Sequence, residues 1–157
     1  MSSDLAQLGV AALRDATIEQ LEANRPLLDT ESYARAHHAL SEMQRVHAAV
    51  AALKADDYSR LGQLLNESHR SLRDDYQVSC PELDVAVNAA IAAGALGARM
   101  VGGGFGGSAI ALVKAEEVPA IETAVAAAFA KAGFGSPRFF VAESADGAQA
   151  ELLEPEA

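Results

Sequence analysis

The sequence predicts an antiparallel α+β fold in which a small sheet packs against helices and the N-terminal half is rich in helix. Through most of residues 17–93, apolar side chains recur at the spacing of a helix with one buried face. Two short apolar runs follow, separated by a glycine-rich segment, and after them come another stretch of helical period and a last short run. The order strand, loop, strand, helix and strand places helices on one side of an antiparallel sheet.

Three helices are expected in the N-terminal half. Residues 17–23 predict a short helix, and Asp29 or Thr30 can cap a long helix that runs to residue 54. Another helix is expected over 57–73, and the short junction makes the two long helices neighbours. The apolar positions that repeat along these two helices are Ala36, Ala39, Leu40, Met43, Val46, Val50, Leu53, Leu61, Leu64, Leu65 and Leu72.

Two more helices are expected in the C-terminal half. The segment Ser79-Cys80-Pro81-Glu82 has the spacing of a capping box with proline in the first turn, and it predicts a helix that ends near residue 93. A helix over 116–131 is expected to end at Gly133, because glycine adopts the left-handed backbone that terminates helices. The inward positions of these helices are Leu83, Val87, Ala90, Ile91, Val118, Ile121, Val125 and Phe129.

Three strands are expected, over residues 98–101, 109–113 and 136–141. The second is a run of small apolar residues, which is typical of a buried strand. Residues 4–12 are expected to form a short helical or irregular start. The acidic, small-residue tail over 146–157 is expected to be frayed.

The composition narrows the class of protein. At 157 residues the chain fits one domain over 1–157, of which residues 1–3 could derive from cloning. A formal net charge of −10 and a pI near 4.7 argue against binding to nucleic acid or to an anionic membrane, since both require basic patches. An acidic chain can still bind ATP, because Mg²⁺ and N–H donors at a local site matter more than net charge.

The chain is expected to be cytoplasmic. Its single cysteine, Cys80, excludes an internal disulfide and a cysteine-rich metal site, and is expected to be a small buried residue rather than a nucleophile. No apolar stretch has the length of a transmembrane helix, and the N-terminus lacks the basic and apolar regions of a signal peptide.

Composition does not explain the segment 102–107. Around Phe105, glycine occupies five of its six positions, Gly102, Gly103, Gly104, Gly106 and Gly107. Ordering glycine costs backbone entropy, so such a cluster requires left-handed backbone, a tight turn or close approach of amide groups to a ligand. A nest of N–H donors suits the oxygens of a phosphate or a sugar. A tight structural connection between two strands is the alternative interpretation.

Two nucleotide-binding motifs do not fit this segment. The spacing Gly102-x-Gly104-x-x-Gly107 matches the dinucleotide fingerprint, but that fingerprint opens a helix, whereas a strand is expected here. No Lys-Ser or Lys-Thr pair follows the glycines, so the segment is not a P-loop either.

The run from Arg99 to Gly107, Arg-Met-Val-Gly-Gly-Gly-Phe-Gly-Gly, resembles the third conserved motif of galactokinases, a family within the GHMP kinase superfamily. Val101 stands where that family usually has Thr, so a role for the threonine hydroxyl is not carried over, and Ser108 stands where it usually has Cys. The resemblance covers nearly the whole chain, through residues 67–76, 78–84, 13–15, 33–38, 139–141 and 146–148.

The resemblance implies the ferredoxin-like C-terminal domain of GHMP kinases. In the complete enzyme, the γ-phosphoryl group of ATP is transferred, with Mg²⁺, to the C1 hydroxyl of galactose. The family's sugar-binding signature, phosphate loop and catalytic aspartate belong to an N-terminal kinase domain, and no matching string occurs here. We therefore expect a chain without a catalytic or metal-binding residue, whose partner is that N-terminal domain. Alone, it is expected to be inactive and to bind neither ATP nor Mg²⁺ tightly.

The resemblance also implies roles for the glycine segment. Its five glycines would line the cleft and brace the phosphate loop of the N-terminal domain, and Phe105 would anchor the segment by packing into the core. Two alternatives stay open. One is a portion of another GHMP small-molecule kinase, against which the Gly-Gly-Gly-Phe-Gly-Gly string and the Leu-Arg-Asp-Asp-Tyr string count. The other is a non-catalytic module of this fold for ligand sensing or protein association.

The remaining polar candidates have simpler interpretations. The four histidines are expected to be solvated or core side chains, because no carboxylate pair at i,i+4 spacing completes a metal site with them: His37, His38, His47 and His69. A charged string is interpreted as an ion-pair network at a helix end, with a residue facing the cleft or the partner domain as the alternative: Arg70, Arg73, Asp74 and Asp75.

Overall fold

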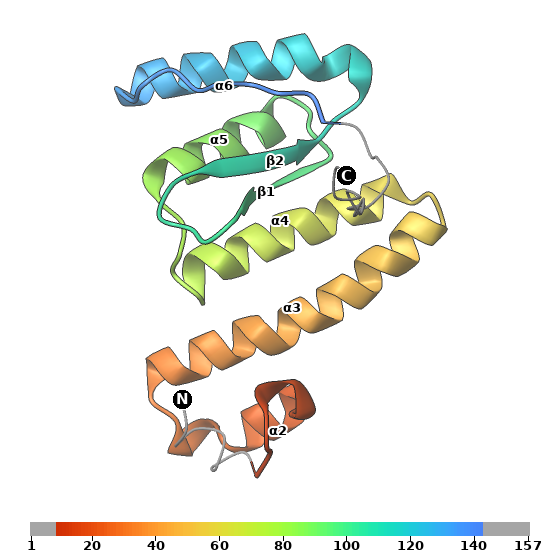
Figure 1. The fold of residues 1–157 in the computed structure, drawn as a ribbon, viewed down its shortest axis with the longest axis vertical. Helices are drawn as coiled ribbons and strands as arrows, with labels where there is room; N and C mark the ends of the chain where they lie inside the picture. The colour runs from red at the N-terminus through yellow and green to blue at the C-terminus, as the bar shows by residue number, and fades with distance from the viewer. Residues whose placement is uncertain (1–8, 143–157) are drawn as a thin grey trace, which may run out of the picture.

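Two long antiparallel helices, α3 (Thr30–Lys54) and α4 (Tyr58–Asp74), lie side by side in the computed structural model, which describes residues 9–142 (Figure 1). The other elements are η1 (Leu13–Asp15), α2 (Ile18–Ala23), η2 (Arg25–Leu27), α5 (Pro81–Ala92), β1 (Gly97–Val101), β2 (Ser108–Leu112), η3 (Ala115–Glu117) and α6 (Val118–Ala132). None of the described helices combines the length and the apolar composition needed to cross a bilayer.

Side-chain caps start three helices where the sequence predicts them. Thr17 Oγ1 accepts a hydrogen bond from the Gln20 amide at 3.2 Å, and Gln20 Oε1 accepts one from the Thr17 amide at 2.8 Å. Asp29 and Asp57 each accept a 2.9 Å hydrogen bond from the amide three residues further on. The expected beginnings of α2, α3 and α4 are therefore confirmed.

The capping box predicted for α5 is wrong. Cys80 stands before the first turn with extended backbone, at φ −138° and ψ 164°, and its side chain caps no amide. Because the helix begins at Pro81, Ser79 lies outside it, and its hydroxyl donates a 2.6 Å hydrogen bond to Asp84 Oδ1. The helix itself is confirmed, with Leu83, Val87 and Ala90 buried as expected.

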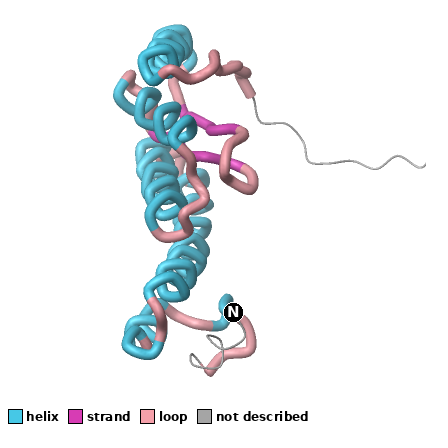
Figure 2. The backbone as a smooth tube through the Cα atoms, turned by 90° about the vertical axis from the view of Figure 1, so that its left-hand side faces the viewer, coloured by secondary structure: helices cyan, strands magenta, loops and turns pink. Residues whose placement is uncertain are grey.

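β1 and β2 form an antiparallel hairpin in which Gly97 pairs with Leu112 and Val101 with Ser108. Figure 2 shows the helices stacked in one layer with the hairpin on one side of it, which confirms the predicted α+β arrangement. Ile110 in β2 is 48% exposed. The interpretation of β2 as a buried strand is therefore wrong for its outer face.

The third strand expected over 136–141 is not formed. After α6 ends at Gly133, with a left-handed φ of 76°, the chain runs back past this helix without joining the sheet (Figure 1). Pro137 has no amide hydrogen to donate, and Phe140 and Val141 are 77% and 72% exposed, so burial does not favour strand pairing here. The expectations for residues 4–8 and 146–157 lie outside the described residues.

Buried apolar side chains of the described residues form three clusters. At the N-terminal end, Leu21, Leu28 and Leu40 form a cluster that fastens α2 to the first half of α3. The main core lies between α5, α6 and the hairpin, and consists of Val87, Ala90, Ala95, Ala98, Ile121, Val125 and Phe129. A smaller cluster of Leu72, Leu83 and Met100 joins the end of α4 to α5 and β1.

Polar side chains of α3 and α4 contact one another directly. His38 Nδ1 lies 3.0 Å from Ser71 Oγ, and the hydroxyl of Ser68 donates to Glu42 at 2.8 Å. The apolar face predicted for α3 is confirmed at Leu40, which is 3% exposed. It is wrong further along, where three predicted inward residues are 55%, 45% and 51% exposed: Val46, Val50 and Leu53.

One face of α4 follows the edge of β1 that does not pair with β2. Gly62 lies against Gly97 so closely that a Cβ at Gly62 would lie 2.2 Å from the Leu96 carbonyl oxygen, and one at Gly97 would lie 2.0 Å from the Gly62 carbonyl oxygen. One turn later, Asn66 Oδ1 accepts a 2.9 Å hydrogen bond from the Ala98 amide. The helix thus covers the strand edge and satisfies a donor on it.

Replacing Gly62 with alanine tests this contact. At an open helix position the change would stabilise the fold by about 1 kcal/mol, because alanine has the higher helix propensity. Here we expect it to lower the free energy of unfolding by about 2–4 kcal/mol, because helix and strand must separate to admit the methyl group. Urea denaturation measures the change.

The exposed neighbour Gln63→Ala serves as the control on the same helix, with an expected change of less than about 0.5 kcal/mol. A Gly62→Ala variant as stable as the wild type would show that α4 and β1 are not held at this distance.

Candidate functional site

The glycine loop, residues 102–107, joins β1 to β2 and contains the residues expected to form the site. Phe105 has a left-handed φ of 59°, which is uncommon for a bulky residue. Four of the five glycines also have left-handed backbone, with φ of 86°, 89°, 131° and 94° at Gly102, Gly104, Gly106 and Gly107. The left-handed backbone that the sequence predicts for this segment is therefore present at these four glycines, and it is absent at Gly103.

A single backbone contact fixes the loop to the connector between α4 and α5. The Phe105 amide donates a 2.7 Å hydrogen bond to the Val78 carbonyl oxygen. A Cβ at Gly104 would lie only 2.3 Å from the same oxygen. Gly104 is therefore required both by its backbone conformation and by its distance from Val78.

Phe105 does not have the position expected for it. Its side chain is 77% exposed, so the prediction that the ring packs into the core is wrong. The loop is anchored by the Phe105 amide rather than by its ring. Left-handed backbone at this residue turns the chain so that the amide, and not the side chain, faces the connector.

The other glycines border open space in this chain. A Cβ at any of Gly102, Gly103, Gly106 and Gly107 would meet no atom within 4 Å. Left-handed backbone explains glycine at three of these four positions, but no contact or conformation within the described residues explains it at Gly103. Chemically, a loop of this kind offers exposed backbone donors to an anionic or sugar ligand.

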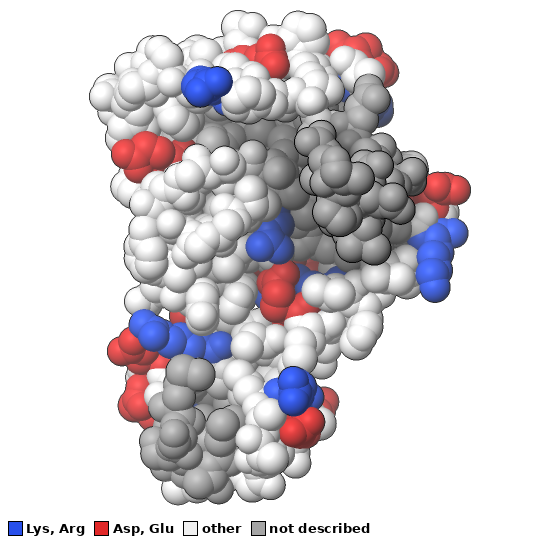
Figure 3. Space-filling model, viewed as in Figure 1, with Lys and Arg blue, Asp and Glu red and all other residues white. Residues whose placement is uncertain are grey.

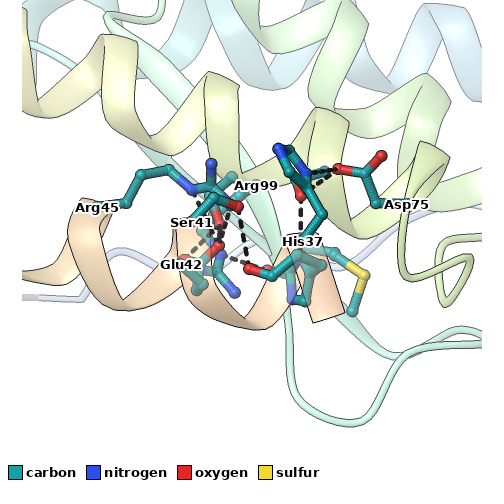
Figure 4. A network of polar contacts seen from close by, with 10 residues as sticks. His37, Ser41, Glu42, Arg45, Asp75 and Arg99 are labelled. Carbon is teal, nitrogen blue, oxygen red and sulfur yellow. Dashed lines mark hydrogen bonds and ion pairs between the residues drawn. The ribbon is translucent and has the colours of Figure 1, made fainter. Parts of the chain in front are cut away.

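Glu42 on α3 is the centre of a polar network that joins three elements (Figure 4). Its carboxylate accepts hydrogen bonds from Ser68 on α4 at 2.8 and 2.9 Å, from Arg45 at 3.0 and 3.1 Å, and from Arg99 on β1 at 3.2 Å. Burial raises the pKa of Glu42, but the hydrogen bonds from Ser68 and Arg45 and the charges of the two arginines outweigh it, so the pKa lies below its usual value. The network thus holds an ionised carboxylate where β1 enters the glycine loop.

His69 on α4 is buried between β1 and α5. Its Nδ1 accepts a 3.3 Å hydrogen bond from the Met100 amide, which leaves the ring proton on Nε2. Nε2 lies 3.2 Å from Asp84 Oδ1, off the line of a good hydrogen bond. Desolvation lowers the pKa of His69 despite the charge of Asp84, so the ring is neutral at physiological pH.

A second buried histidine lies at the other side of α4. His38 stacks on Tyr76 with 4.7 Å between the ring centres, and its Nδ1 lies 3.0 Å from the hydroxyl of Ser71. That hydroxyl donates to Asp75 at 2.7 Å, and His37 Nδ1 lies 3.4 Å from the same carboxylate. Burial lowers the pKa of His38 as it does that of His69.

The charged string at the end of α4 forms one ion pair among its own members, so the ion-pair network expected there is confirmed only in part. Arg73 Nε lies 2.7 Å from Asp74 Oδ1, and Asp75 binds Ser71 on the preceding turn. Arg70 is exposed. An open groove of about 270 Å³ between α3 and α4 is lined by His37, Arg45, Glu67, Arg70, Ser71, Asp74 and Asp75.

Charge is distributed without a broad basic area on the face seen in Figure 3. Most of the visible Lys and Arg side chains lie beside acidic ones, and wide uncharged areas separate these groups. This distribution agrees with a chain of net charge −10.

Sequence reasoning did not find Glu42, Asn66, His69 or Asp84 as residues that organise this region. They stand among ordinary helical residues, and the signal that distinguishes them is the long-range contact itself. Arg99 and Glu42, for example, are 57 residues apart in the chain.

Comparison with known proteins identifies the family. The model of the C-terminal portion of GHMP kinases matches residues 49–131, more than half of the chain. Galactokinases are among the relatives: that of Streptomyces coelicolor is 50% identical over 146 residues, that of Bos taurus 46% over 143 and that of Homo sapiens 45% over 147. These alignments cover 90–93% of this chain but only 36–38% of the relatives.

Solved structures give the same result. The crystal structure of Lactococcus lactis galactokinase complexed with galactose matches 87% of this chain and 37% of its own, with a TM-score of 0.80 and 38% identity. L. major mevalonate kinase in complex with R-mevalonate matches 54% of this chain and 26% of its own, with a TM-score of 0.51 and 40% identity. The chain belongs to the GHMP kinase family, and the resemblance described from its motifs is confirmed.

Buried neutral histidines predict how stability depends on pH. In the unfolded chain His38 and His69 titrate near 6.5, and in the folded chain their pKa values are lower. Below pH 6.5 the unfolded state therefore binds more protons, so stability is complete above this pH and falls as the pH decreases. We expect urea denaturation to show a loss of about 1–2 kcal/mol between about pH 7.5 and about pH 5.5.

The exposed His47→Gln variant is expected to show the same loss and serves as the control. Equal stability at the two pH values would mean that the buried rings accept protons in the folded state without cost.

The variant Glu42→Gln tests the polar network. It leaves Arg45 and Arg99, both largely buried, without their anionic partner, and we expect the free energy of unfolding to fall by about 1–3 kcal/mol. Glu31→Gln, which breaks the exposed pair with Arg35, is the matched control and should cost less than about 1 kcal/mol. Equal effects of the two changes would show that Glu42 contributes no more than a surface ion pair.

Proposed function

We propose that this chain is the C-terminal portion of a galactokinase, the enzyme that transfers the γ-phosphoryl group of ATP to the C1 hydroxyl of galactose. The observation that carries this proposal is the extent of the similarity, because galactokinases from a bacterium, cattle and humans match it at 45–50% identity over about nine-tenths of its length. The galactose complex of the Lactococcus lactis enzyme, with a TM-score of 0.80, supports it further.

In this proposal the glycine loop borders the cleft that holds the reacting groups. Phosphoryl transfer depends on positioning and on stabilising charge, with Mg²⁺ and N–H donors around the phosphates. Gly102, Gly103, Gly104, Gly106 and Gly107 would let the loop approach the phosphate-binding loop of the N-terminal kinase domain closely. ATP and Mg²⁺ belong to the complete enzyme, and the base for the sugar hydroxyl is not assigned to this chain.

A chimera tests the proposal directly. This chain replaces the corresponding C-terminal portion of the Streptomyces coelicolor galactokinase, to which it is 50% identical. We expect galactose-dependent ATP turnover from the chimera and none from the chain alone. A folded chimera that phosphorylates another small alcohol, such as mevalonate, instead of galactose would favour the other kinases of this family, one of which matches over about half of the chain. A folded chimera with no activity would favour a non-catalytic module.

Two alanine substitutions in the chimera separate the loop's own requirements from those of the cleft. In the free chain, Gly104→Ala should lower stability, because Gly104 has left-handed backbone and contacts Val78, whereas Gly103→Ala should change it by less than about 0.5 kcal/mol. In the chimera we expect both changes to lower kcat/KM, by about tenfold or more, because a Cβ at Gly103 would face the phosphate loop.

Steady-state kinetics with galactose and ATP measure this effect. If the Gly103→Ala chimera has the same kcat/KM as the unsubstituted chimera, Gly103 does not line the cleft.

A further inference from the structure

We propose that His69 is a positioning residue for the glycine loop, holding the loop at both of its attachments through the two nitrogens of one buried ring. The structural part of this proposal concerns this chain alone. Its consequence for catalysis rests on the function proposed above, so the two are tested separately.

The first attachment is the strand that enters the loop. Nδ1 of His69 accepts the Met100 amide at 3.3 Å, two residues before Gly102, and the side chain of His69 is 3% exposed. Met100 is itself completely buried, against Leu72 and Leu83. Because the ring cannot exchange this partner for water, the strand and the helix move together.

The second attachment is the connector that holds the middle of the loop. Nε2 of His69 is buried against Asp84 Oδ1 at 3.2 Å, a contact that lies off the line of a hydrogen bond, and the same oxygen accepts the 2.6 Å hydrogen bond from Ser79. Val78, the residue before Ser79, accepts the Phe105 amide at 2.7 Å. The contacts therefore form a closed ring that runs from β1 through His69, Asp84 and the connector to the loop and back to β1.

Asn66 provides a comparison within the same helix. Like His69, it accepts an amide from the edge of β1, that of Ala98 at 2.9 Å. It stands one turn before His69, and none of its hydrogen bonds reaches the connector. Asn66 therefore joins α4 to β1 as His69 does, but it does not contact the connector that holds the loop. For this reason it is the matched control.

The charges around His69 come from each element packed on it. Asp84 on α5 favours the protonated ring, whereas Arg73 on α4, Arg99 on β1 and burial disfavour it. Asp74, at the end of α4, also interacts with the ring. The neutral ring with its proton on Nε2 is the form that accepts the Met100 amide while Nε2 stays in contact with Asp84, because a protonated Nδ1 could not accept that amide.

The variant His69→Asn tests the ring of contacts. The shorter amide keeps an oxygen where Nδ1 stands and removes the group that contacts Asp84. Amide hydrogen exchange by NMR in this chain, compared with global stability from urea denaturation, is the measurement. We expect the exchange rate of the Phe105 amide to rise about tenfold more than the change in the global unfolding equilibrium accounts for. The exchange rates of Met100 and Ala98 should change only as that equilibrium does.

Asn66→Ala is the control, for which exchange should accelerate at Ala98 and not selectively at Phe105. If His69→Asn does not fold, Asp84→Asn serves instead, because Asp84 is the more exposed partner in the contact with His69 Nε2. It weakens that contact and should accelerate exchange at Phe105 in the same way. The proposal would be overturned if the exchange rate of the Phe105 amide in the folded variants changed only as much as the global unfolding equilibrium does.

The state of the ring itself gives a spectroscopic test. Long-range ¹H–¹⁵N correlation of the His69 ring should show the proton on Nε2 and none on Nδ1. A proton on Nδ1 would contradict the contact with Met100 and, with it, the first attachment.

Kinetics of the chimera test the catalytic consequence. We expect His69→Asn to lower kcat severalfold and to leave KM for galactose within about twofold, since the ring positions the loop without touching the sugar. A change in KM with kcat unchanged would contradict this role. An inactive parent chimera would contradict the proposed function, while hydrogen exchange in the free chain still decides the positioning role.

Discussion

The structure depends on the contact in which α4 covers the unpaired edge of β1. A two-stranded hairpin is at best marginally stable alone, and β1 has an edge whose amides do not pair with β2. α4 covers that edge with residues spaced by four and three positions, Gly62, Asn66 and His69, which meet Gly97, Ala98 and Met100 in order. The match is geometric: seven residues of helix rise about 10.5 Å, and the three steps of strand from Gly97 to Met100 span about 10 Å. The helix therefore stays in register with the strand over the whole contact.

This contact determines where the glycine loop lies. Because β1 is held along α4, the loop begins at a defined place beside the connector between α4 and α5, where Val78 accepts the Phe105 amide. Glu42 adds α3 to the same assembly through Arg99, the first residue of the motif shared with galactokinases. The motif's arginine thus has a structural explanation within this chain, and so do four of its glycines. Gly103 has none, and for this reason it is the most informative position for testing the proposed cleft.

Patterns over a few residues predicted helix caps well. They failed where contacts with distant residues determine which side chains are buried. The caps at Thr17, Asp29 and Asp57 involve residues three apart, so they can be recognised before the fold is known. Val46 and Val50 have the spacing of a buried stripe but remain about half exposed, because periodicity shows that one face is apolar and does not show which face a neighbour covers. The expected strand over 136–141 failed for the same reason. Its residues have the composition of a strand, but no neighbouring strand buries them.

The sequence by itself determined the helices, the hairpin, the need for left-handed backbone in the glycine loop and the membership of the GHMP kinase family. These properties depend on residues that are adjacent or a few positions apart, and on long motifs that can be compared directly. Only the tertiary structure decided that Phe105 points to solvent, that Glu42 joins three elements, and that His69 lies between β1 and α5. Those facts depend on contacts between residues far apart in the chain, which exist only once α4 has been laid along β1.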